Sequence, residues 1–213
     1  MLAGHYSAAL VAKAVAPRAP LWSLFVAAQL VDIAWALFVL AGIEHFRLDP
    51  SLPSNPLDLY HMPYTHGLVA TFVWAGAAYL GARAWLGDSR AALAIAAVTA
   101  SHWGLDWLVH RPDLPLWGDS YKVGLALWDR PWLAWWVELG FIAASAFALW
   151  RTLPAEPTAR RKLALLVAVL GLVHLLSLSP PALPTTSAFA TFALTLYVVL
   201  AGAAWQLDPR ERG

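Results

Sequence analysis

Long apolar runs separated by short polar segments dominate the chain and predict a bundle of membrane-spanning helices. Six runs have roughly the 17–25 residues that a transmembrane helix needs. They cover residues 21–43, 65–85, 91–110, 132–150, 163–179 and 186–206. A shorter run at residues 2–16, ended by Pro17 and Pro20, would reach only ~22 Å at ~1.5 Å per residue and predicts a short N-terminal helix. We therefore expect an all-α fold: a polytopic membrane bundle of six transmembrane helices plus this short helix.

The composition favours a single integral-membrane domain over residues 1–213. Hydrophobic residues make up 60% of the chain and charged residues 13%, against about 25% charged residues in soluble domains. The N-terminal run lacks the basic segment of a cleavable signal peptide. The absence of cysteine excludes disulfides, Fe–S clusters and thiolate metal sites. We expect no soluble domain and no nucleic-acid partner.

Two polar segments, residues 44–64 and 111–131, are rich in proline and predict structured loops at one end of the bundle. Counted over alternate loops, four Lys and Arg residues fall on the side of these segments and ten on the opposite side. The positive-inside rule then makes the side with ten cytoplasmic. The two long loops would be external, on the periplasmic side in a Gram-negative cell.

A polar stripe interrupts the apolar run at residues 91–110. His102, Asp106 and His110 follow one another at spacings of four, so they share one face of a helix. Ionisable residues inside a membrane-length helix are costly and usually face a bundle interior or a water-filled cavity. The stripe therefore predicts a functional site.

Polar residues from other segments reach a similar depth and predict a metal centre. Counted from the cytoplasmic ends at ~1.5 Å per residue, Asp32 lies ~16 Å deep, His102 ~17 Å, Asp106 ~23 Å and His66 ~28 Å. His5 joins them if the N-terminal helix is inserted; the alternative is a helix lying flat on the cytoplasmic interface. Imidazoles and carboxylates without sulfur suit a hard or borderline divalent cation. The predicted metal ligands are His5, Asp32, His61, His66, His102 and Asp106.

Several other polar residues have two interpretations: a role at the metal site or an ordinary structural role. Gln29, Glu138 and Asp113 are candidates to hold the ligands by hydrogen bonds. A helix–helix hydrogen bond would equally explain Gln29, and a turn would explain Asp113. Arg111 is a candidate phosphate contact, with an ordinary interfacial charge as the alternative. His174, which has no acidic neighbour in the sequence, is expected to be a hydrogen-bonded packing residue.

Two motifs resemble the signature blocks of a known family. The segments HMPYTHG at 61–67 and SHWGLD at 101–106 resemble those of bacterial inner-membrane metal-dependent hydrolases of the LexA-regulated, YdjM-like type, which are distantly similar to zinc-dependent phospholipase C and S1/P1-type nucleases. The family pattern also has an early His and an Asp in the next apolar segment, and these positions are matched by His5 and Asp32. The resemblance covers roughly residues 1–150, leaves residues 151–213 as two additional transmembrane helices, and implies a place in the bacterial inner membrane.

The chemistry implied by these residues is metal-assisted hydrolysis of a phosphoester. The expected cofactor is a divalent metal, zinc first, with manganese or iron as alternatives. Asp32 and His110 are the catalytic candidates, with His110 as a general acid. A site in the outer half of the bilayer predicts a membrane lipid or a lipid-linked small molecule as the substrate.

Two other classes of function compete with hydrolysis. A small transporter or channel would use the same residues as a proton or ion pathway. A bis-histidine haem protein would use His66, His102 or His174, but carboxylates have no ligation role beside a haem. Metal analysis and a visible absorption spectrum separate these alternatives.

Overall fold

The fold is helical apart from one small sheet. The structure, a computed structural model, describes residues 1–179 and 181–209. Its α-helices are α1 (Tyr6–Val15), α2 (Leu21–Ala28), α3 (Leu30–Leu40), α4 (Leu68–Leu86), α5 (Ser89–Val109), α6 (Pro131–Trp150), α7 (Pro157–Leu176) and α8 (Thr186–Gln206). Two short 3₁₀ turns, η1 (Ala3–His5) and η2 (Leu127–Asp129), and the strands β1 (His45–Leu48) and β2 (Leu57–His61) complete it. The predicted helical class is thus confirmed.

Three helices, α5, α6 and α8, are long and apolar enough to cross a membrane. The bent pair α2 and α3 makes a fourth if the two helices form one span. These helices are consistent with a multi-pass membrane protein. The six spans predicted from the sequence are not confirmed, because α4 and α7 are not among these helices.

The segment predicted as a span at residues 21–43 is not one continuous helix, because the helix breaks at Gln29. α2 and α3 meet there at an angle of 54°. The amide of Gln29 donates to the carbonyl of Leu2 at 3.0 Å, and the Nδ1 atom of His102 donates to the carbonyl of Ala28 at 2.9 Å. Side chains that bond to backbone groups at a break are a common cause of a sharp bend. The break therefore places Asp32 in the first turn of a new helix.

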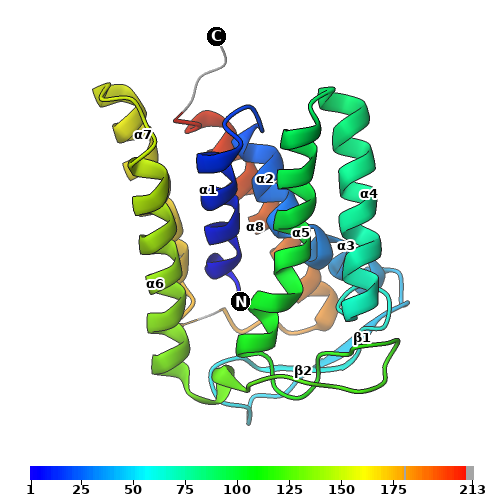
Figure 1. Cartoon of the computed structure of the whole chain (residues 1–213). Helices are drawn as coiled ribbons and strands as arrows, with labels where there is room; N and C mark the ends of the chain where they lie inside the picture. The colour runs from blue at the N-terminus through cyan, green and yellow to red at the C-terminus, as the bar shows by residue number, and fades with distance from the viewer. Residues whose placement is uncertain (180, 210–213) are drawn as a thin grey trace.

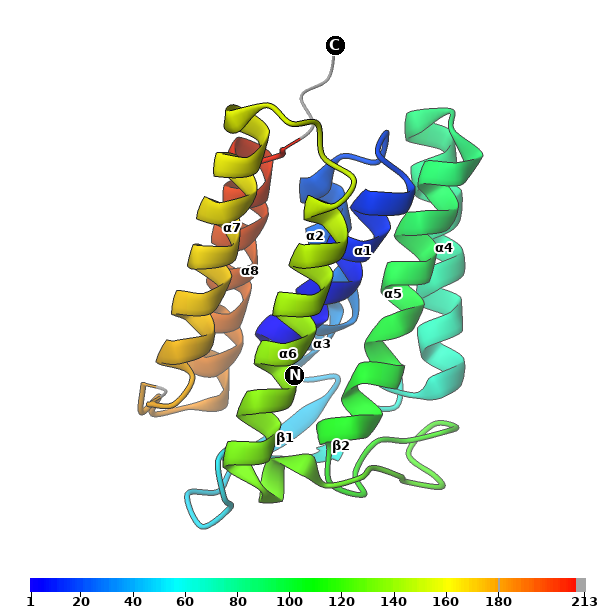
Figure 2. The same cartoon turned by 60° about the vertical axis from the view of Figure 1, so that its left-hand side comes forward.

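The N-terminal segment lies inside the bundle. α1 packs against α2, α5 and α6, and the N-terminus sits at mid-height between the helices in both views (Figures 1 and 2). Tyr6 and Leu10 are fully buried. Of the two placements weighed from the sequence, the inserted one is observed, and it brings His5 beside Asp32.

The predicted loop at residues 44–64 contains an antiparallel hairpin. β1 pairs with β2, with His45 opposite His61 and Leu48 opposite Leu57. The hairpin lies across one end of the bundle, close to the start of α4 and the end of α5 (Figure 1). Apolar side chains of the hairpin hold it in place, because Phe46, Leu57 and Leu59 are buried.

Two helix starts are defined by a proline and an aspartate. α7 begins at Pro157, because proline is well tolerated in the first turn of a helix. Asp88 is the N-cap residue of α5. The Asp88 carboxylate accepts from the N–H groups of Ala91 and Arg90, and these bonds lower the pKa of Asp88.

Candidate metal centre

Two carboxylates, one buried and one partly buried, form the middle of the site. Asp106 lies one turn before the end of α5, and its side chain is 2% exposed. Asp32 lies in the first turn of α3, and its side chain is 17% exposed. The partial positive charge of a helix N-terminus favours a carboxylate there, so the break at Gln29 provides a suitable place for Asp32. Asp32 is the more accessible of the two.

His102 directs one ring nitrogen at both carboxylates. Its Nδ1 donates to the Ala28 carbonyl at 2.9 Å, so the lone pair of the neutral ring is on Nε2. Nε2 lies 3.0 Å from Oδ2 of Asp106 and 3.6 Å from Oδ1 of Asp32. This buried atom has no hydrogen-bond partner among the described residues. A lone pair this close to two carboxylates is unfavourable unless a cation or a proton lies between them.

His66 repeats the arrangement from the start of α4. Its Nδ1 lies 2.9 Å from Oγ1 of Thr65, and its Nε2 lies 3.1 Å from Oδ1 of Asp32. The Thr65 hydroxyl donates to Glu44 at 2.6 Å, so its oxygen accepts from the Nδ1–H of His66. The lone pair of Nε2 again faces a carboxylate.

His110, at the end of α5, is the third histidine that bonds to a partner through Nδ1 and directs Nε2 at a carboxylate. Its Nδ1 donates to Oδ1 of Asp113 at 2.8 Å, which leaves the lone pair of the neutral ring on Nε2. Nε2 lies 3.5 Å from Oδ2 of Asp106. Asp113 thus holds the ring of His110 by a hydrogen bond.

His5 completes the cluster from the N-terminal side. Its ring stacks on that of His102 with the centroids 3.9 Å apart, and its Nε2 lies 3.0 Å from Oδ1 of Asp106. The amine of Met1 lies 2.7 Å from the same carboxylate oxygen. Glu138 accepts from the N–H of Gly4 at 3.0 Å and so fixes the turn that carries His5. Gln29 holds the same segment through the Leu2 carbonyl.

The donor set fits a divalent metal ion. Two groups have ligand atoms within 4.8 Å of one another: His5, Asp32 and His102, and His66, His102 and Asp106. Both groups offer only nitrogen and oxygen, which suits zinc, manganese or iron. A metal-binding His characteristically donates its other ring N–H to a carbonyl or carboxylate, as His102 and His110 do. A shared divalent cation would also balance the charges of Asp32 and Asp106, which are costly to remove from water.

Two predicted site residues lie elsewhere. His61 pairs through Nδ1 with Asp119 and belongs to neither metal-capable group within the described ranges, because the β1–β2 pairing holds it at the hairpin edge. The guanidinium of Arg111 donates to Asp129 at 2.8 Å and to the Pro53 carbonyl at 2.9 Å. Arg111 therefore joins the two long loops, and its contact with phosphate stays a prediction.

Two polar residues at the site were not foreseen from the sequence. Glu44 is fully buried beneath the hairpin and contacts Thr65. The hydroxyl of Tyr197, from α8, donates to Oδ2 of Asp32 at 3.3 Å. Tyr197 lies beyond residues 1–150, the part of the chain that the family resemblance covers. The bonding partner of each residue is distant in sequence, so no local pattern marks them.

His174 differs from the cluster histidines. Its ring stacks on Trp135, and its Nε2 donates to the Trp135 carbonyl at 2.9 Å. The nearest carboxylate oxygen, on Glu138, is 3.9 Å from Nδ1. This geometry agrees with the expected packing role.

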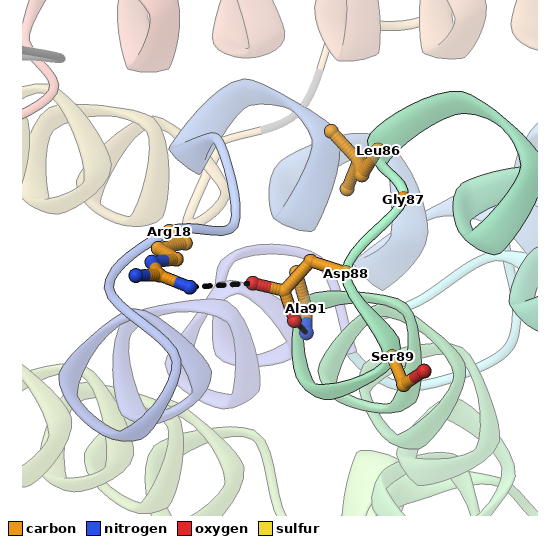
Figure 3. Close-up of a pocket in the computed structure, with 6 residues that line it drawn as sticks. All are labelled: Arg18, Leu86, Gly87, Asp88, Ser89 and Ala91. Atoms are coloured by element: carbon orange, nitrogen blue, oxygen red, sulfur yellow. Dashed lines mark hydrogen bonds and ion pairs between the residues drawn. The ribbon is translucent and has the colours of Figure 1, made fainter.

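A surface hollow lies at the opposite end of the bundle and is separate from the cluster. Figure 3 shows its lining: Arg18, Leu86, Gly87, Asp88, Ser89 and Ala91. Arg18 lies 3.7 Å from the Asp88 carboxylate, which already caps α5. The hollow therefore has no cluster of ligands comparable to the buried centre.

Comparisons of the chain with protein-family models, curated proteins and solved structures find no match.

Proposed function

We propose that this protein is a membrane-embedded, metal-dependent hydrolase that cleaves a phosphoester in a membrane lipid or lipid-linked substrate. The observation that carries the proposal is the shared orientation of His66, His102 and His110. Each uses Nδ1 to bind an outer partner and points Nε2 at Asp32 or Asp106. The resemblance of the two sequence motifs to metal-dependent hydrolases supports the same reaction class.

The roles of the residues follow from their exposure and partners. Zinc, or alternatively manganese or iron, would be held by His5, Asp32, His66, His102 and Asp106. When bound, such an ion lowers the pKa of water and polarises a phosphoryl oxygen. Asp32, the more exposed carboxylate, would accept a proton from the attacking water. His110, oriented by Asp113, would act as an imidazolium: it would carry a second proton on Nε2 and donate that proton to the leaving oxygen.

The proposal is tested by metal-dependent phosphoester hydrolysis in detergent micelles. Purified protein should cleave a chromogenic phosphodiester or a fluorescent phospholipid, lose this activity with a chelator and regain it with Zn²⁺. Asp32→Asn should lower the rate by about 10²–10⁴, the usual contribution of a general base. Asp58→Asn, a hairpin carboxylate paired with Arg47, is the control and should keep the rate. Metal-loaded protein that cleaves neither substrate would contradict the proposal.

A second candidate function is a proton or ion pathway. The observation that favours it is the break between α2 and α3 beside the cluster, since transporters often build binding sites from discontinuous helices. Vesicles containing the protein would then show a pH- or ion-driven flux that Asp32→Asn abolishes. Hydrolysis without flux would exclude this alternative.

The proposed topology has six membrane spans, formed by α2 with α3 and by α4 to α8, with α1 inserted beside them and the hairpin end external. The chain has no cysteine, so single cysteines report position directly. Exposed positions Ser54 and Ser120 should react with an impermeant thiol reagent in intact cells after change to Cys, whereas Thr158 should not. Thr158→Cys should react only after permeabilisation. The reverse labelling pattern would overturn this orientation.

A further inference from the structure

Glu44 is a buried carboxylate that accepts three hydrogen bonds and, within the described residues, belongs to neither metal-capable group. It follows α3, has no exposed surface, and faces the segment that leads into α4. Oε1 accepts from the backbone N–H groups of Tyr64 at 2.8 Å and Thr65 at 3.0 Å. Oε2 accepts from the Thr65 hydroxyl at 2.6 Å. A buried carboxylate is costly unless it is satisfied in this way, so its presence calls for a role.

The contacts fix the direction of a chain of hydrogen bonds. An ionised carboxylate only accepts, so the single hydroxyl proton of Thr65 goes to Glu44. The Thr65 oxygen must then accept from Nδ1–H of His66, 2.9 Å away. The lone pair of the neutral ring is left on Nε2, which lies 3.1 Å from Asp32. Glu44 thereby selects the tautomer that can bind a metal ion at the cluster.

We propose that Glu44 is a positioning residue that, through Thr65, sets the tautomer and ring orientation of His66 for metal binding. The inference rests on the metal centre of the proposed function, but not on hydrolysis. Outer partners of this kind typically change metal affinity by about 10–100-fold. His102 and His110 have simpler partners, a backbone carbonyl and a neighbouring carboxylate. His66 alone among these three depends on a two-residue relay.

Substitutions at the two relay residues separate this role from simple packing. In Glu44→Gln, the amide oxygen can still accept from the two backbone N–H groups, while the amide NH₂ faces Thr65 and donates to it. The Thr65 proton then goes to Nδ1 of His66, which places a proton on Nε2 and opposes metal binding. Thr65→Val removes the link with little change in volume, and Thr65→Ser keeps the hydroxyl.

The test is metal affinity of the full-length protein in detergent, measured with Zn²⁺ by competition with a chromophoric chelator. Glu44→Gln and Thr65→Val should bind Zn²⁺ about 10–100-fold more weakly than the wild type. Thr65→Ser and the control Asp58→Asn should bind as the wild type does. Histidine ¹⁵N shifts provide a second readout: His66 should carry its proton on Nδ1 in the wild type and Thr65→Ser, and on Nε2 in Glu44→Gln.

The outcomes distinguish this inference from the proposed function. Suppose that the wild type binds Zn²⁺ and that Glu44→Gln and Thr65→Val bind it with the same affinity. This result would overturn the role of Glu44 and leave the metal centre intact. A wild type that binds no Zn²⁺ would overturn the metal centre, and unchanged ¹⁵N shifts of His66 in Glu44→Gln would then overturn the relay as well. If Glu44→Gln does not fold, Thr65→Val and Thr65→Ser carry the test.

Discussion

His102→Ala should lower the metal content of the purified protein by at least about 10-fold while the bundle stays folded. The imidazole of His102 is common to both metal-capable groups, and its Nε2 lies within 3.6 Å of both carboxylates. Loss of a ligand should cost at least as much as loss of an outer partner, whose effect is about 10–100-fold. The change is measured by elemental analysis after removal of loosely bound ions, with helical content followed by circular dichroism.

The chain offers a matched control in His174→Ala. His174 is equally buried, but it bonds to the Trp135 carbonyl and belongs to neither metal-capable group in the part of the chain that the structure describes. This variant should lose packing stability and keep its metal. Equal metal content in His102→Ala and the wild type would show that His102 is a structural residue.

Removal of the metal ion should lower the thermal stability of the wild type. A ligand that binds only the folded protein stabilises it by about 2.7 kcal/mol when its free concentration is 100 times its dissociation constant. Without the ion, only the Met1 amine, 2.7 Å from Asp106, and protons on the imidazoles are left to balance the two carboxylates, which lie 3.0–3.6 Å from the Nε2 atoms of His66, His102 and His110. The thermal unfolding midpoint in detergent should therefore fall with a chelator and recover with Zn²⁺.

The change of the thermal unfolding midpoint with a chelator should require an intact cluster of His and Asp ligands. In His102→Ala the chelator should change the midpoint little, because the metal is already lost. A wild-type midpoint that is the same with chelator and with Zn²⁺ would argue that the cluster is a metal-free polar network.

Hydropathy predicted most of the helices because burial of apolar surface in a bundle needs long apolar runs. It failed at Gln29, where the break depends on hydrogen bonds to Leu2 and His102, which are remote in sequence. It also missed the β1–β2 hairpin, whose short strands lie among prolines that indicated an irregular loop. In both places the backbone conformation depends on contacts with residues that are distant in sequence.

The candidate site was predictable where helical spacing carried the information. The stripe of His102, Asp106 and His110 follows from a repeat of four, and the structure brings it to one place. His61 was misplaced because its strand pairing with His45 could not be read from the loop sequence. Glu44 was missed for a similar reason: it resembles an ordinary loop residue until Thr65, 21 positions later, folds over it.

The central claim is that the buried His and Asp cluster holds a metal ion, and the most direct test is the metal content of the purified wild type combined with X-ray absorption at the metal edge. The account predicts at least one divalent ion per chain, with nitrogen and oxygen neighbours at about 2.0–2.2 Å and no sulfur. Folded protein that contains no metal, and takes up none when supplied with zinc, manganese or iron, would contradict it.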